Sequence, residues 1–292
     1  MFFQLYQQEV TYIYILQTMM KVYPIAKINL GLNVVNKRPD GYHDLETVFY
    51  PIGITDELMI EEGGNDCSLS IDGLSIEGSV ENNLVVRAYR AVKERCPHLP
   101  PVNITLKKRI PMQAGMGGGS ADCAYTITAL NTMFQLGLDE QEMRSMAKSL
   151  GADCPFFINP TPAYATGIGE KLSPIPLQLD NYHIAIVKPP LAISTKEAFA
   201  GITPKHPAKC CREIVAQPIE TWKDELKNDF EESIAPQHPE IADIKQRLYD
   251  KGAVYAAMSG SGSALFGIFK ESPANLQESF NDCFTAIVKQ NG

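Results

Sequence analysis

A glycine-rich stretch between residues 111 and 121 constrains this chain more than any other part of it; it reads Pro-Met-Gln-Ala-Gly-Met-Gly-Gly-Gly-Ser-Ala. A β-prone run at 102–106 precedes it, and apolar residues at helical spacing follow it to about Leu136. Glycine lets backbone N–H groups turn toward an anion, and the N-terminus of the following helix adds further free N–H groups. The order strand, glycine loop, helix therefore predicts a phosphate-binding loop.

Two better-known phosphate-binding motifs fit this loop poorly. The P-loop ends in Gly-Lys-Ser/Thr, whereas this loop ends in Gly119-Ser120-Ala121 and contains no lysine. The dinucleotide fingerprint has a third glycine where Ser120 stands and a strand ending in an acidic residue about 20 residues later. Here, residues 139–150 have the pattern of a second helix. A glycine-rich turn without a ligand stays open as the simplest alternative, although ordering four glycines has a high entropic cost.

Composition narrows the classes of protein to which the chain can belong. Its 292 residues are enough for two modest domains. The formal net charge of −8 argues against a protein whose binding is dominated by nucleic-acid phosphates. Seven scattered cysteines show neither Cys-x-x-Cys nor zinc-like spacing, which indicates structural thiols in a reducing cytoplasm. The sequence has no apolar run as long as a membrane span, so we expect no membrane association.

Strand and helix patterns both occur along the chain, and we expect an α+β fold. Residues 22–54 have the pattern of a β-hairpin with a Pro-Asp-Gly turn near its middle. The helix after the glycine loop is expected to end at Gly137, and the spacing of Asp139 and Glu142 predicts a capping box for the next helix. The tail at 275–289 has the periodicity of an amphipathic helix.

Proline and glycine residues between 160 and 176 suggest a boundary between two domains. We therefore expect an N-terminal domain at 20–165, which contains the predicted phosphate-binding loop, and a C-terminal domain at 166–292. Residues 1–19 are aromatic and glutamine-rich and lack the basic start and cleavage site of a secretory signal. They could add a strand or helix, or reflect a misassigned start site; we expect a dispensable extension.

Two ionisable side chains lie in apolar surroundings and are candidates for chemistry. Lys27 interrupts an apolar strand, where an ammonium costs several kcal/mol unless it has a partner. Asp153 follows a helix-ending glycine and precedes Cys-Pro-Phe-Phe. The simpler alternatives are an edge strand with Lys27 in solvent and an aspartate that caps the next turn. If the two meet, the carboxylate can accept a hydroxyl proton while the cation keeps it ionised, as phosphoryl transfer to an alcohol requires.

Two further segments could contact a ligand. Tyr42 and His43 follow the Pro-Asp-Gly turn, where aromatic rings can stack on a base, although packing of Tyr42 and solvation of His43 are the simpler alternative. The Ser-Gly-Ser-Gly-Ser loop at 259–263 offers hydroxyls and backbone N–H groups, but alone it is a weak signal.

Five motifs together resemble the GHMP kinases, the family named for galactose, homoserine, mevalonate and phosphomevalonate kinases. In chain order they are Ala26-Lys27-Ile28-Asn29-Leu30, Arg38-Pro39-Asp40-Gly41-Tyr42-His43, Gly117-Gly118-Gly119-Ser120, Gly151-Ala152-Asp153-Cys154-Pro155-Phe156-Phe157 and Met258-Ser259-Gly260-Ser261-Gly262-Ser263. The likeness covers about Met20 to Phe269 and is greatest to the branch that acts on 4-diphosphocytidyl-2-C-methyl-D-erythritol.

The resemblance implies a two-domain GHMP-kinase fold with the active site in the interdomain cleft, and transfer of the ATP γ-phosphate to the substrate's 2-hydroxyl on the non-mevalonate route to isoprenoid precursors. It implies ATP and Mg²⁺ as cofactors, a small-molecule substrate, and a monomer or weak dimer. Asp153 would be the base, and Lys27 would orient and neutralise. The ATP loop would comprise Pro111, Met112, Gln113, Ala114, Gly115, Met116, Gly117, Gly118, Gly119, Ser120 and Ala121. The substrate would contact Asn29, Tyr42, His43, Thr195 and Phe199.

The chain departs from the family pattern within the glycine loop. Gln113, Met116 and Ala121 stand where glycine or alanine, leucine and serine are usual, and Ala121 lacks a hydroxyl that could contact a phosphate. A kinase for mevalonate or homoserine is the nearest rival, and the turn before Tyr42 argues against it. A nucleotide-binding sensor without catalysis is a second rival, against which the presence of both Lys27 and Asp153 argues.

Overall fold

The computed structural model describes residues 18–75 and 78–290, so most of the expected extension at 1–19 lies outside the described residues. The chain forms two compact units. Among the described residues, the first comprises 18–24, 55–75, 78–110 and 118–159, and the second comprises 25–54, 111–117 and 160–290. Each unit combines segments that are separate in the sequence. The two continuous domains expected at 20–165 and 166–292 stay a prediction.

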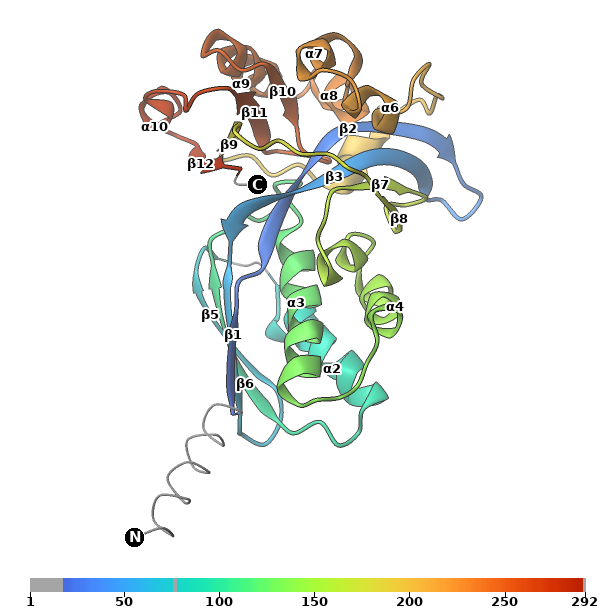
Figure 1. Ribbon diagram of the computed structural model, residues 1–292, viewed down its shortest axis with the longest axis vertical. Helices are drawn as coiled ribbons and strands as arrows, with labels where there is room; N and C mark the ends of the chain where they lie inside the picture. Colours follow the sequence, from blue (N-terminus) through green and yellow to red (C-terminus); the bar gives the residue numbers. More distant parts are fainter. Residues whose placement is uncertain (1–17, 76–77, 291–292) are drawn as a thin grey trace. The chain divides into compact units, whose positions relative to one another are not determined.

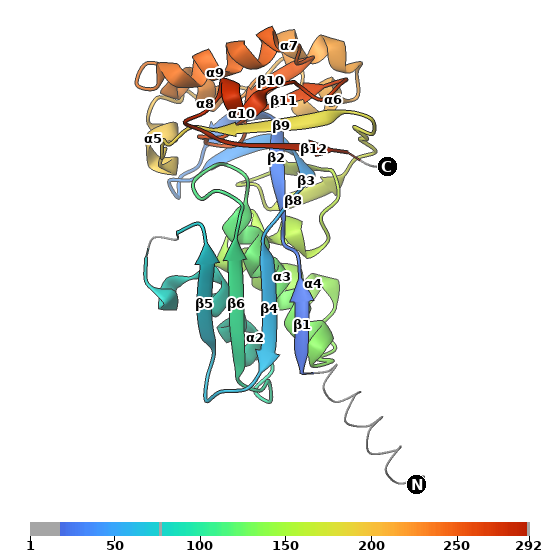
Figure 2. The same cartoon turned by 90° about the vertical axis from the view of Figure 1, so that its left-hand side faces the viewer.

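The first unit contains a four-stranded sheet in the order β1-β4-β6-β5, seen face-on in Figure 2. Its strands are β1 (Met19–Val22), β4 (Glu57–Glu62), β5 (Ser68–Gly73) and β6 (Val102–Lys108). β4 runs antiparallel to both neighbours, whereas β5 runs parallel to β6. Buried and more exposed residues alternate along β6, as expected of a strand with one face on the core. This alternation places Lys108, at the end of β6, on the buried face.

Helices cover one face of this sheet (Figure 1). They are α2 (Leu84–Arg95), α3 (Gly118–Met133), α4 (Glu140–Leu150) and η2 (Cys154–Ile158), whereas η1 (Val80–Asn82) precedes α2 and has no buried residue. The predicted capping box between Asp139 and Glu142 is confirmed at the start of α4. The prediction that Gly137 ends α3 is wrong: Gln135 adopts the left-handed conformation, and the Leu136 N–H donates to Asn131 O at 3.1 Å.

The second unit contains two four-stranded sheets, in the orders β2-β3-β7-β8 and β10-β11-β9-β12. The first is built from β2 (Ile25–Lys37), β3 (His43–Thr55), β7 (Ala163–Thr166) and β8 (Lys171–Pro174). The second is built from β9 (His183–Lys188), β10 (Tyr255–Met258), β11 (Leu265–Phe269) and β12 (Phe284–Lys289). β2 and β3 confirm the predicted hairpin.

Short helices pack on the second of these sheets (Figure 1). They are α5 (Thr195–Ala200), α8 (Asp229–Ile234), α9 (Pro239–Asp250) and α10 (Leu276–Ser279). η3 (Ile219–Thr221) leads into α7 (Trp222–Glu225), which meets β10 through Trp222 and Tyr255. α6 (Cys211–Val215) instead contacts β2 and β3, where Cys211 hydrogen-bonds with Asn33 and Glu46. The predicted helix at 275–289 is wrong, because only the four residues of α10 are helical and β12 pairs antiparallel with β9. None of the described helices is long and apolar enough to cross a membrane.

Candidate active site

Lys27 is buried on β2, in the second unit. Its side-chain ammonium donates hydrogen bonds to Asn29 Oδ1 at 2.6 Å and to the carbonyl of Gly115 at 2.8 Å. The ammonium also lies 5.0 Å from the ring centre of Phe49, a favourable cation–π distance. Only 3% of the residue is exposed, so the alternative in which Lys27 faces solvent from an edge strand is wrong. The ammonium instead projects to where the glycine loop passes.

Asn29 holds its side chain in one orientation beside Lys27. Its Nδ2 donates to Thr47 Oγ1 at 3.0 Å, and the Thr47 hydroxyl donates in turn to the carbonyl of Gly31. Because the single hydroxyl proton of Thr47 is used there, Thr47 can only accept from Asn29. This relay makes Nδ2 the atom that faces Thr47 and leaves Oδ1 to accept from Lys27. The arrangement therefore specifies the direction of the Lys27 ammonium.

The first part of the glycine loop packs on the Ser-Gly-Ser-Gly-Ser loop between β10 and β11. Gly115 has φ +68°, and a Cβ there would lie 1.8 Å from the carbonyl oxygen of Ser259. The Ser263 N–H donates to Gln113 O at 3.2 Å, and the Lys27 N–H donates to Met116 O at 3.0 Å. The loop at 259–263, a weak signal in the sequence, is thus the support on which the predicted ATP loop rests.

The second part of the glycine loop belongs to α3, in the first unit. The helix begins at Gly118, three residues before the expected start at Ala121. Gly118 to Ala121 therefore form the first turn, whose backbone N–H groups have no partners within the helix. Ala121 is fully buried, so its methyl group packs in the core where the family usually has serine. The predicted order of strand, glycine loop and helix is confirmed.

A buried ion cluster, missed by the sequence analysis, holds the start of α3. The Lys108 ammonium donates to Asp122 Oδ2 at 2.8 Å and also binds Asp56, which accepts from the Ile110 N–H at 2.8 Å. Burial raises the pKa of Asp122 to about 7, against the opposing charge of Lys108. A Cβ on Gly118 would lie 3.0 Å from Lys108 Nζ, so the ammonium packs directly against the first helical residue. The sequence did offer one signal, a lysine at a buried position of a strand with alternating apolar and polar residues. Its partners could not be predicted, because they lie 52 and 14 residues away.

Asp153 lies in the first unit, between α4 and η2, and is half-buried. In this described segment its side chain makes no capping hydrogen bond, although it occupies the position before η2. Its neighbour Cys154 is buried, and hydrogen bonds with Cys123 and Ser120 hold the pKa of the Cys154 thiol below its usual value despite that burial. Within this unit the predicted base therefore lies next to the end of the predicted ATP loop. Lys27 belongs to the other unit, so its meeting with Asp153 stays a prediction.

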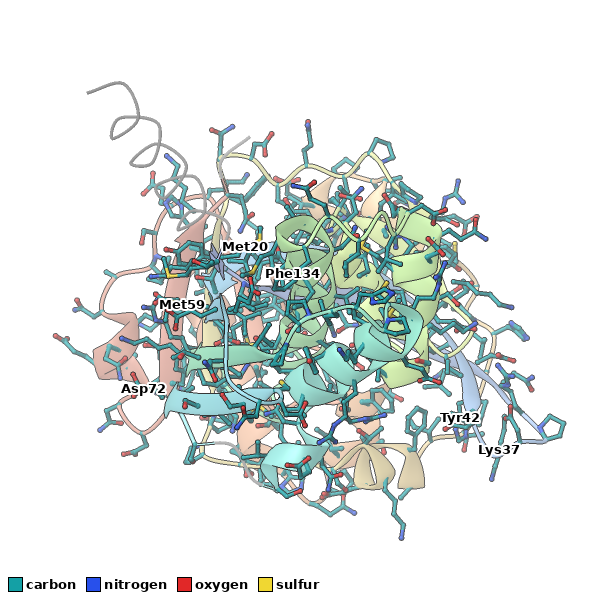
Figure 3. The ribbon with its side chains drawn as sticks, turned by 90° about the horizontal axis from the view of Figure 1, so that it is seen from below. Met20, Lys37, Tyr42, Met59, Asp72 and Phe134 are labelled. Carbon is teal, nitrogen blue, oxygen red and sulfur yellow. The ribbon has the colours of Figure 1, made fainter. Side chains whose placement is uncertain are left out.

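The predicted substrate contacts lie in the second unit. Tyr42, on the turn between β2 and β3, is 61% exposed (Figure 3). The ring of His43 stacks on Phe199 of α5, with centroids 4.6 Å apart and planes 16° apart. Phe199 also meets Phe230 edge-on at 4.8 Å. Thr195 is exposed at the start of α5. His43 and Phe199 are thus brought together, 156 positions apart in sequence.

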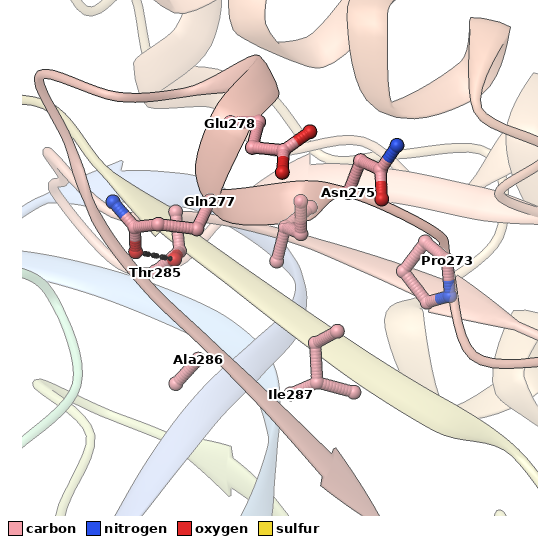
Figure 4. A pocket seen from close by; sticks show the side chains of 8 residues that line it. Pro273, Asn275, Gln277, Glu278, Thr285, Ala286 and Ile287 are labelled. Carbon is pink, nitrogen blue, oxygen red and sulfur yellow. Dashed lines mark hydrogen bonds between the residues drawn. The ribbon is translucent and has the colours of Figure 1, made fainter.

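A cavity of about 360 Å³ between α10 and β12 is a separate feature (Figure 4). Its lining residues are Pro273, Asn275, Leu276, Gln277, Glu278, Thr285, Ala286 and Ile287. This lining contains no lysine or arginine and none of the predicted site residues. The cavity therefore offers no positive charge to hold a phosphate.

Asn228 was also missed by the sequence analysis. Its Nδ2 donates to the carbonyls of Met258 and Gly260, both at 2.8 Å, and its Oδ1 accepts from the Phe230 N–H at 3.0 Å. An asparagine just before a helical run is a recognisable N-cap signal. The signal gives no hint that the other side-chain atom fixes the backbone on both sides of Ser259.

Comparison with known proteins places this geometry in a family. Residues 83–159 match the GHMP kinases N terminal domain, and residues 211–286 match the GHMP kinases C terminal domain. Among solved structures, the chain resembles a 4-(cytidine 5'-diphospho)-2C-methyl-D-erythritol kinase with TM-score 0.78 and 29% identity, covering 94% of this chain and all of that one. A homoserine kinase from Cytophaga hutchinsonii shares the fold alone, with TM-score 0.68 and 15% identity.

Curated relatives are more similar in sequence. A 4-diphosphocytidyl-2-C-methyl-D-erythritol kinase of Parabacteroides distasonis is 47% identical over 264 residues, which cover 90% of this chain and 96% of the relative. One of Bacteroides thetaiotaomicron is 50% identical over 254 residues, covering 86% and 92%. Identity at this level over nearly the full length of both proteins means that the chain belongs to the 4-diphosphocytidyl-2-C-methyl-D-erythritol kinase family of GHMP kinases.

Proposed function

We propose that this protein transfers the γ-phosphate of ATP to the 2-hydroxyl of 4-diphosphocytidyl-2-C-methyl-D-erythritol, a step on the non-mevalonate route to isopentenyl diphosphate. The observation that supports this most is identity of 47–50% to kinases of that name over nearly their whole length. The site is compatible with it, because a buried ammonium lies at the loop expected to hold the triphosphate. Mevalonate and homoserine kinases share only the fold with this chain, at 14–15% identity.

The roles of the individual residues form part of the proposal. Asp153 takes the proton from the substrate hydroxyl, and Lys27 orients the reacting groups and neutralises developing charge. Backbone N–H groups of residues 111–121 hold the phosphates. Tyr42, His43, Phe199, Thr195 and Asn29 contact the substrate. The stacked pair of His43 and Phe199 supports the assignment of this region to the cytosine, because the flat face of an aromatic ring can stack on a nucleobase.

Mg²⁺ is proposed as the metal that accompanies ATP. Among the described residues, no three His, Cys, Asp or Glu side chains gather in a metal-binding cluster. This fits an ion held mainly by the ATP phosphates, the usual arrangement for Mg²⁺ in kinases. When bound, the ion neutralises charge on the transferring phosphates.

The seven free cysteines support a reducing, cytoplasmic environment.

A substrate comparison tests the proposal. Purified protein is assayed for ATP turnover with 4-diphosphocytidyl-2-C-methyl-D-erythritol, mevalonate and homoserine in turn. We expect turnover with the first substrate alone. Turnover with either of the others would reassign the substrate, and nucleotide binding without turnover on any of the three would indicate a sensor.

A further inference from the structure

The hydroxyl of Ser259 links Asn29 and Gly115, two residues that accept hydrogen bonds from the Lys27 ammonium. It accepts from the backbone N–H of Asn29 at 3.2 Å and donates to the carbonyl of Gly115 at 2.8 Å. Lys27 itself donates to the Asn29 side chain and to that same carbonyl. The four residues thus form a closed ring of hydrogen bonds, in which Ser259 binds both residues that accept from the ammonium.

The surroundings of Ser259 leave its hydroxyl little freedom. The residue is 1% exposed, and its N–H donates to Ala264 O at 2.9 Å. Asn228 fixes the carbonyls on either side of it, those of Met258 and Gly260. The hydroxyl is therefore held in place by its own neighbours. A group that orients another side chain must itself be fixed in this way.

We infer that Ser259 is a positioning residue for Lys27: it fixes the Gly115 carbonyl and the β2 backbone at Asn29, and these two fix the direction of the ammonium. The inference deepens the proposed function and rests on it as far as catalysis is concerned. Without the hydroxyl, the Gly115 carbonyl loses one of its donors and the Asn29 N–H loses its acceptor. The ammonium can then leave the direction needed for phosphoryl transfer while the substrates still bind.

The test uses Ser259→Ala, with Ser259→Thr to restore a hydroxyl and Ser263→Ala as a matched control. Ser263 lies in the same loop and is equally buried, but its hydroxyl donates to the carbonyl of Leu191. We expect kcat of Ser259→Ala to fall at least tenfold with each KM within about threefold, Ser259→Thr to recover most of the loss, and Ser263→Ala to keep kcat within twofold at a similar melting temperature. A kcat unchanged in Ser259→Ala, or lost equally in Ser263→Ala, would overturn the inference.

A second measurement separates this inference from the proposed function. With ¹⁵N-labelled lysine, the side-chain ammonium resonance of Lys27 is assigned by its loss in Lys27→Met. We expect Ser259→Ala to shift or broaden this resonance and Ser263→Ala to leave it in place, whether or not any substrate is turned over. An unchanged resonance in Ser259→Ala would refute the positioning role, whereas a shifted resonance in a protein without turnover would refute only the proposed substrate.

Discussion

Replacing single glycines of the predicted ATP loop by alanine should separate three physical roles that cannot be told apart from the sequence. At Gly115 the backbone has φ +68°, and a new Cβ would lie 1.8 Å from the Ser259 carbonyl oxygen, a distance that real Cβ atoms do not adopt. The left-handed conformation costs an alanine about 1–2 kcal/mol. Separating the two loops by about 1 Å also breaks the 2.8 Å hydrogen bond from Ser259, worth about 1 kcal/mol. We expect Gly115→Ala to lower the free energy of unfolding by about 3 kcal/mol.

The other two glycines should respond differently. At Gly118 the φ angle lies outside the left-handed region, so the backbone itself accepts alanine. A Cβ there would lie 2.9 Å from Ile110 Cγ2 and 3.0 Å from Lys108 Nζ, so we expect Gly118→Ala to lower the free energy of unfolding by about 1 kcal/mol. At Gly119 the nearest atom is Leu84 Cδ1 at 3.8 Å, an ordinary contact. Alanine within a helix is favoured over glycine by about 0.5–1 kcal/mol, so Gly119→Ala should be slightly stabilising.

Thermal and urea unfolding of the three variants and the wild type measure this series. The expected order of stability is Gly119→Ala, wild type, Gly118→Ala, Gly115→Ala, and the last should melt roughly 6 °C below wild type, at about 2 °C per kcal/mol for a chain of this size. Gly115→Ala should also lose activity, because Gly115 supplies a carbonyl to Lys27. A Gly115→Ala melting temperature within 1 °C of wild type would refute the argument from loop packing.

Three further predictions concern single side chains. Asp153→Asn should lower kcat by about 10²–10⁴-fold with substrate binding retained by calorimetry, and loss of binding instead would make Asp153 structural. Asp122→Asn should flatten the pH dependence of stability measured by urea unfolding. Because folding raises the pKa of this carboxyl from 3.8 to about 7, its contribution to the free energy of unfolding is complete below pH 3.8 and is lost as the pH rises through 7, by up to about 4 kcal/mol. Equal pH profiles of stability in the variant and the wild type would contradict the raised pKa. Phe199→Ala should raise the KM of the cytidylated substrate about tenfold and leave that of ATP unchanged, whereas an equal rise in both would argue against base stacking.

Local signals predicted much of the fold, because they act over a few residues. The hairpin at 22–54 and the capping box at Asp139 depend on turn chemistry and hydrogen bonds within one turn of chain. The prediction of a helix at 275–289 was wrong because a long-range contact decides the structure there. The periodicity of this segment allows a helix, but β9 offers an open edge about a hundred residues earlier, and pairing with it makes residues 284–289 a strand.

The residue types of the candidate site could be predicted, but the contacts that orient them could not. Lys27 is recognisable as an ammonium in an apolar strand, and Asp153 as a carboxylate beside an apolar run. The groups that direct Lys27 come from places that no local pattern connects, since Ser259 is 230 positions from Asn29 and Gly115 is 88 positions from Lys27. Their meeting depends on packing of whole strands and loops, which periodicity does not encode.

Asn29 illustrates how a predicted contact acquires a second role once its neighbours are known. The resemblance assigns it to the substrate, and that stays a proposal. In the structure its Oδ1 accepts from Lys27 and its Nδ2 donates to Thr47, so the bound orientation of the amide is already decided before any ligand arrives. A substrate that hydrogen-bonds to this amide must therefore do so in the geometry that also directs the ammonium. Such a substrate would couple its own position to the direction of Lys27 through one side chain, a physical reason for an asparagine two residues after the lysine proposed to be catalytic, on the same face of a strand.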